Sequence, residues 1–153
     1  METREYRFID KTAWDEGPWQ QEPDKVQWED KQTQLPCLIV RHPRLGQLCG
    51  YVGITQGHRY FETPYDDVDV DCHGGLTFSG FCQEFDKEHG VCHVPALGEP
   101  DHVWWLGFDC AHAYDLLPGL LEAHIPYFED IYRDLAYVQN ECAQLARQLS
   151  NVG

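Results

Sequence analysis

Two short segments of this chain hold most of the side chains that could do chemistry. Residues 109–115 (DCAHAYD) bring two aspartates, a cysteine and a histidine together directly after an apolar, aromatic run at residues 103–108. Upstream, residues 67–75 (DVDVDCHGG) place three aspartates, a cysteine and a histidine next to paired glycines. Polar residues that follow a buried strand are a common location for a functional site. We therefore expect the two segments to meet at one site.

Metal binding is the first chemistry that these residues suggest. If the strand ends in a helical turn, Asp109 and His112 lie on the same side of that turn. Together with His73 they form a mixed nitrogen and oxygen ligand set, which suits zinc or another divalent transition metal and leaves a position for water. Such an ion generates a nucleophile near neutral pH. Asp71 and Asp115 are then candidates for the general base or for orienting a ligand.

Other interpretations of the same residues remain open. Cys110 could act as a nucleophile with a nearby histidine as its base, provided that its pKa is depressed. Gly74 and Gly75 could present backbone amides to an anion, or could simply form a tight turn. Asp109 could cap a turn while His112 is a core histidine, in which case the segment has only a structural role.

Hydrophobic patterns indicate the strands that would position these residues. Apolar runs rich in β-branched and aromatic residues predict strands, and so does the alternation of apolar residues with aspartate in the upstream segment. The expected strands are residues 37–41, 48–54, 67–72, 76–79 and 103–108. The first two should form a hairpin because their link is short and contains Pro43 and Gly46. The last is the most apolar, so we expect it near the centre of the sheet.

Two further regions look irregular. Residues 1–34 are polar but contain Trp14, Trp19 and Trp28, which we expect to anchor this segment to the core, with short edge strands in places. Residues 82–100 are interrupted by glycine and proline and carry several charges, so they indicate a long loop.

The end of the chain changes to a helical period. Apolar residues recur in steps of three and four from Phe128 to Leu149, and Pro126 stands just before them, as is common near a helix start. We expect a helix over residues 127–149 that packs on the sheet, since the stripe lacks the matched charges of a coiled coil. The elements together predict an α+β fold: a single domain, residues 1–153, with a mainly antiparallel sheet from the region 35–110 packed against a long C-terminal helix.

Composition narrows the function classes. The formal net charge of -15 argues against direct nucleic-acid binding through a broad surface. It also permits a surface that imitates nucleic-acid phosphate and occupies a basic partner. No apolar run approaches the roughly 20 residues that span a bilayer, and the charged first residues lack the apolar core of a signal peptide. We therefore expect a cytoplasmic protein with no membrane contact.

The seven cysteines are odd in number and include no C-x-x-C pair. In a chain of this length without an export signal, a disulfide framework is not expected, and most of these cysteines should be small buried residues. One alternative is that Cys82, Cys92 and His93 tie the loop through a second metal ion.

Three strings resemble a known family. HGGLT at residues 73–77, VWWLGFDCAH at residues 103–112 and YRDLAYV at residues 132–138 are similar to a family of small, mostly uncharacterised proteins of bacteriophages and bacteria. The resemblance covers most of the chain and implies an accessory role in a phage or mobile element, without an activity to assign to residues. The family carries glycine where this chain has Tyr114.

Two functional hypotheses follow. The first is a metal-assisted hydrolase that acts on a small polar or phosphorylated molecule, which is based on His73 and the residues 109–115. The second is an acidic, non-enzymatic binding protein that inhibits a basic partner, such as a host-defence or nucleic-acid-binding protein, through charge mimicry. The sequence leaves the oligomeric state open.

Overall fold

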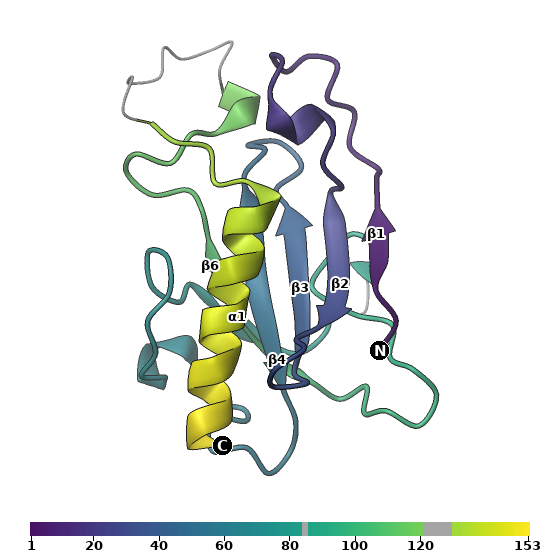
Figure 1. Ribbon diagram of the computed structural model, residues 1–153, viewed down its shortest axis with the longest axis vertical. Helices are drawn as coiled ribbons and strands as arrows, with labels where there is room; N and C mark the ends of the chain where they lie inside the picture. Colours follow the sequence, from purple (N-terminus) through teal and green to yellow (C-terminus); the bar gives the residue numbers. More distant parts are fainter. Residues whose placement is uncertain (84–85, 121–129) are drawn as a thin grey trace.

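Six antiparallel strands form one sheet, and a C-terminal helix packs across one face of it (Figure 1). The computed structural model describes residues 1–83, 86–120 and 130–153. The strand order is β1-β2-β3-β4-β6-β5. The elements are β1 (Arg4–Tyr6), β2 (Lys25–Glu29), β3 (Pro36–Arg41), β4 (Leu48–Ile54), β5 (Phe78–Gly80), β6 (Trp104–Asp109) and α1 (Leu135–Val152), with short 3-10 turns at Pro18–Gln20, Tyr65–Asp67 and Pro118–Leu120. The expected α+β domain is confirmed.

The middle of the sheet is apolar on both faces because both faces are covered. On β3, Cys37 and Ile39 pack in the cluster that includes α1, whereas Leu38 packs in a second cluster on the opposite face. The expected β3–β4 hairpin is confirmed, with Ile39 opposite Gly50. The strand expected at residues 103–108 forms as β6, but it is not central, since it lies next to the short edge strand β5.

The helix begins later than its apolar stripe predicts. Asp134 caps the N-terminus of α1, and its Oδ1 accepts a hydrogen bond from the Tyr137 amide at 2.9 Å. The backbone of Ile131 instead pairs with the strand-like segment at Asp115, so residues 130–134 cannot continue the helix, and the expected start at residue 127 is wrong for this part. Phe128 and Pro126 lie outside the described residues. The rest of the stripe is confirmed, because Val138, Cys142, Leu145 and Leu149 are buried.

Close packing of α1 on β4 depends on Gly50. A Cβ atom at this position would come within 2.8 Å of the Cys142 Sγ atom. Within the described residues, none of the helices combines the length and hydrophobicity that a membrane crossing requires.

The expected strand at residues 67–72 is wrong. Asp67 ends a 3-10 turn, and in the described structure residues 68–73 are assigned to no strand. The side chain of Gln148 on α1 bonds both the amide and the carbonyl of Asp71, each at 2.8 Å, so a helix side chain replaces a strand partner. The alternation arises because Val68 is buried while Asp69 and Asp71 face solvent.

The region 1–34 is more regular than expected. It provides β1 and also β2, which is an interior strand paired with both β1 and β3. Trp19 anchors the intervening segment as expected: its side chain is buried, and its indole N–H donates to the Asp15 carbonyl at 2.8 Å.

A disulfide joins Cys82 and Cys92. This bond was not expected, and it rules out the metal site proposed for these two cysteines and His93. The bond closes a loop whose described residues are assigned to no strand, which agrees with the irregular loop expected for this region. Among the described residues, Cys37, Cys49, Cys72, Cys110 and Cys142 are free thiols.

A buried ion network connects the N-terminal segment, β3 and the start of α1. The fully buried Arg41 guanidinium lies 3.1 Å from Asp24 Oδ1 and 3.3 Å from Glu22 Oε1, and it donates to the Tyr132 hydroxyl at 2.8 Å. Glu22 also accepts from the Tyr132 hydroxyl at 2.6 Å and from the Leu135 amide at 2.8 Å. Each charge is thus compensated, as burial requires.

The first prediction concerns this network. Arg41→Met removes the buried counter-charge of Glu22 and one of the two cations at Asp24, which keeps Lys11 Nζ at 2.6 Å, so we expect the free energy of unfolding to fall by about 3 kcal/mol. Chemical denaturation at pH 7 measures the loss. Arg4→Met is the control, because Arg4 is half-exposed at its ion pair with Glu2 and should contribute less than about 1 kcal/mol. A loss below about 1 kcal/mol for Arg41→Met would contradict the assignment.

Candidate functional site

The carboxylate of Asp115 is the centre of the candidate site. Its side chain is only 1% exposed. His73 Nε2 lies 2.8 Å from Oδ2 and 3.0 Å from Oδ1, and the Arg133 Nε–H donates to Oδ1 at 2.8 Å. The backbone amide of His112 donates to Oδ2 at 3.0 Å. The two oxygens therefore have different partners. Oδ1 accepts from Arg133, whereas Oδ2 accepts from the His112 amide and is the oxygen nearer to His73 Nε2.

The backbone around Asp115 is held by a short parallel bridge. The Ile131 amide donates to the Tyr114 carbonyl at 2.7 Å, and the Leu116 amide donates to the Ile131 carbonyl at 2.9 Å. Tyr114 has a positive φ of 70°, in the left-handed region that favours glycine. The tight turn before Asp115 therefore forms here at the cost of backbone strain.

The Gly74–Gly75 turn brings His73 to the site. Gly74 has a φ of 69°, and a Cβ atom on it would overlap the His112 ring, so the close approach of the two segments requires glycine. His73 Nδ1 lies 2.7 Å from the hydroxyl of Tyr137, in the first turn of α1. One ring nitrogen of His73 thus faces a carboxylate and the other a phenol. Gly75 also has a positive φ, and its amide donates to the Cys72 carbonyl, which makes a turn and leaves this amide unavailable to an anion.

His112 contributes a nitrogen that has no partner. Its Nδ1 atom is buried and makes no hydrogen bond within the described residues. It lies 3.6 Å from Asp115 Oδ2 and 3.5 Å from Asp109 Oδ1. A buried polar atom without a partner is unusual and calls for an explanation, one of which is an ion.

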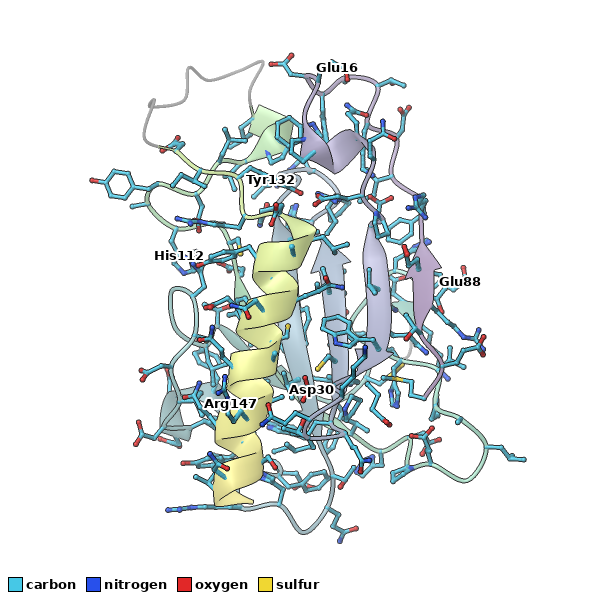
Figure 2. All side chains as sticks on the ribbon, viewed as in Figure 1. Glu16, Asp30, Glu88, His112, Tyr132 and Arg147 are labelled. Carbon is cyan, nitrogen blue, oxygen red and sulfur yellow. A yellow bond between two sulfur atoms is a disulfide. The ribbon has the colours of Figure 1, made fainter. Side chains whose placement is uncertain are left out.

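His73, His112 and Asp115 form a group that could hold a metal ion. Each offers one ligand atom, and these atoms all lie within 4.8 Å of one another. The site is at the N-terminal end of α1, where His112 and Tyr132 lie, whereas Arg147 lies further along the helix (Figure 2). Two histidines and one carboxylate are a common ligand set for divalent transition metals.

The structure separates the other predicted site residues from this group. Asp109 lies at the rim with 34% of its side chain exposed; its Oδ1 accepts from the Ala111 amide at 3.2 Å and, of the group, approaches only His112. Asp71 is exposed, and only its backbone is bonded, to Gln148. Cys110 is 1% exposed and packs in the apolar core below α1. Of the three metal ligands that the sequence suggested, His73 and His112 are in the group, and Asp115 occupies the position expected for Asp109.

Burial and charge set the ionisation of these groups. Burial opposes the ionisation of Asp115, but the hydrogen bonds from His73, Arg133 and the His112 amide outweigh it and keep the pKa of this carboxyl below its ordinary value. Burial raises the pKa of the Cys110 thiol far above its ordinary value, and the nearby Asp115 charge adds to this effect. A protonated, buried thiol is a poor nucleophile, which argues against the cysteine mechanism.

Two residues of the site were not identified from the sequence. Arg133 and Tyr137 are four residues apart, and the Arg133 guanidinium lies 5.1 Å from the centre of the Tyr137 ring. The sequence pattern predicts that both residues lie in the C-terminal helix, and it gives a signal only for the apolar residues of that helix. The signal that could have found them is the string YRDLAYV, in which Asp134 is a helix cap that leaves Arg133 outside the helix.

No family model, curated protein or solved structure matches this sequence. The resemblance to phage and bacterial proteins therefore stays a prediction.

The second prediction concerns pH. The pKa of Asp115 is lower in the folded chain than its unfolded value of about 3.9, so the ionised carboxylate stabilises the fold above about pH 4, and this contribution is lost as the pH falls through the folded-state pKa. Asp115→Asn should lower the free energy of unfolding at pH 7 by more than about 1 kcal/mol. The difference from the parent chain should shrink below pH 4, as measured by urea denaturation from pH 7 to pH 2.5.

Asp69→Asn is the matched control, because this carboxylate is exposed. It should leave the stability within about 0.5 kcal/mol at every pH. An Asp115→Asn difference that stays constant down to pH 2.5 would contradict the role of the ionised carboxylate.

Proposed function

We propose that this chain binds a divalent transition-metal ion, with zinc as the first candidate, through His73, His112 and Asp115, and uses it to hydrolyse a small polar or phosphorylated molecule. One observation carries the proposal. The Nε2 atom of His73 and the Nδ1 atom of His112 both face Oδ2 of Asp115, at 2.8 and 3.6 Å, and this Nδ1 atom makes no hydrogen bond in the part of the chain that the structure describes. Ligand atoms on a tetrahedral zinc ion are about 3.4 Å apart, given bond lengths near 2.0–2.1 Å.

The surrounding residues support the same ligand set. A metal-binding His73 needs its second nitrogen protonated and bonded to an acceptor, and the Tyr137 oxygen at 2.7 Å provides that acceptor. Arg133 bonds only Oδ1 of Asp115, and Oδ2, which accepts the His112 amide, has a second lone pair for an ion. His112 is 35% exposed, which gives a solute access to the group.

Three protein ligands leave a fourth position for water, whose pKa the bound ion would lower toward neutrality. In the proposed hydrolysis, the water oxygen bonds to the phosphorus or acyl carbon, the bond to the leaving group breaks, and the leaving group takes up the proton that water gives away. Asp109 is the carboxylate that we assign to carry this proton, because it lies on the rim 3.5 Å from His112 Nδ1. Asp115 is already committed to His73 and Arg133, and Asp71 lies outside the group.

The third prediction tests the ion. Isothermal titration of the purified, chelator-treated chain with Zn²⁺ should give one site per chain. His112→Asn should weaken this binding at least about 100-fold, because it removes a ligand while the Asp115 network remains. His102→Asn is the control, since His102 is exposed and away from the group, and its titration should match that of the parent chain. Equal binding by His112→Asn and the parent chain would overturn the site.

The fourth prediction tests the chemistry. The zinc-loaded chain should hydrolyse p-nitrophenyl phosphate or a p-nitrophenyl ester, and His112→Asn should abolish this activity. Cys110→Ala should retain it per folded molecule, because the thiol is buried and protonated. Loss in Cys110→Ala would instead favour a cysteine nucleophile. One-to-one zinc binding without hydrolysis would rule out the hydrolase and leave a metal site. Absence of both would leave the acidic binding protein as the remaining hypothesis.

A further inference from the structure

The face of the sheet opposite α1 contains a cavity of about 710 Å³. Its floor consists of Val40 on β3, Cys49 and Tyr51 on β4, and Phe78 on β5. These four residues belong to the apolar cluster that contains no residue of α1, so the cavity is separate from the candidate metal site. Its volume lies within the range of about 300–1,000 Å³ that is typical of small-molecule sites.

The loop that contains Gln83 and Val91 forms one wall of this cavity, and several contacts hold it in place. The Cys82–Cys92 disulfide closes the loop, and inside it the Gln83 amide donates to the Val91 carbonyl at 3.1 Å, while Gln83 Oε1 accepts from the Val91 amide at 3.0 Å. The buried Lys25 side chain on β2 donates to the Lys87 carbonyl at 2.8 Å, which ties the loop to the sheet.

The N-terminal segment closes the opposite side. The rings of Phe8 and His89 are in contact, tilted by 37° with centroids 4.2 Å apart, and both residues line the cavity. The cavity therefore has an apolar floor and two walls that are joined by an aromatic contact.

The charges around the cavity are acidic. Asp10 and Asp86 are among the lining residues, and no lysine is found among those that the structure describes. Thr12 donates to Oδ1 of Asp10, and His89 Nδ1 lies 3.3 Å from Oδ1 of Asp86, so Oδ2 of each carboxylate is the oxygen that can face a cation. Arg41 also lines it, but its guanidinium is committed to Asp24 and Glu22. Burial lowers the pKa of His42, and the nearby charge of Arg44 lowers it further, so this lining residue favours its neutral form.

The floor is uncharged. Burial raises the pKa of Cys49 to about 12 and that of Tyr51 well above its ordinary value, so both groups keep their protons at neutral pH. The Tyr51 and Phe78 rings meet edge to face with centroids 5.4 Å apart. An apolar, aromatic interior with carboxylates among its lining matches a flat ring that carries a cationic group.

We propose that this cavity binds a small aromatic amine, with its ring on Tyr51 and Phe78 and its ammonium group toward Asp10 and Asp86. The net charge of -15 favours the approach of a cation at long range. The proposal is independent of the metal site, which lies beyond the other face of the sheet.

The fifth prediction uses three probes that share one ring. Tryptamine is a cation, indole is neutral and indole-3-acetate is an anion. By NMR titration, we expect tryptamine to bind at least about tenfold more tightly than indole, and indole-3-acetate to bind most weakly. The tryptamine advantage should shrink as salt rises, because the carboxylates are accessible to solvent. Equal affinity for the three probes would overturn the charge assignment.

Variants locate the site. Asp10→Asn and Asp86→Asn should each weaken tryptamine about threefold or more and leave indole unchanged, whereas Asp69→Asn on the other side of the molecule should change neither. Val40→Phe fills the floor and should abolish binding of tryptamine and indole. If Val40→Phe does not fold, the Asp10→Asn, Asp86→Asn double variant decides, and unchanged tryptamine affinity overturns the proposal. His112→Asn should bind tryptamine normally, so that failure of the metal site and failure of this cavity are distinguished.

Discussion

A single buried guanidinium constrains much of this molecule. Arg41 ends β3 with no exposure, and its charge is stable there only because Asp24 and Glu22 approach it from the N-terminal segment. Glu22 in turn bonds the Tyr132 hydroxyl and the first amide of α1, at Leu135. The interaction therefore fixes where three distant parts of the chain meet, and it fixes the position at which the helix begins.

The candidate site depends on this position. Arg133 follows Tyr132 directly, and the parallel bridge of Ile131 with Asp115 runs beside it, so the two sides of the Asp115 carboxylate are presented to different partners. Arg133 compensates the charge of the Asp115 carboxylate at one oxygen, and ring nitrogens of His73 and His112 lie near the other. This arrangement is suited to binding a metal ion. The opposite face of the sheet has a different character, with neutral groups and a loop closed by a disulfide.

Local sequence patterns were sufficient to predict the strands and the helix whose apolar residues follow one another directly or recur at regular steps. The strands expected at residues 37–41, 48–54 and 103–108 form as β3, β4 and β6, each within one residue of the expected bounds, and the stripe from Val138 to Leu149 is one helix face. The pattern failed at residues 67–72, where alternation reflects contact with a helix side chain and not a strand ladder. Side-chain partners of this kind leave no local signal.

The sequence by itself determined that His73 and His112 are candidates, because histidines beside glycines and at a strand end are local features. Only the tertiary structure decided that Asp115 joins them while Asp109 stays at the rim, and that Arg133 and Tyr137 complete the site. The physical reason is that these contacts span many residues in sequence. They follow from a buried ion network and a backbone bridge, whose energies depend on burial that no short window of sequence specifies.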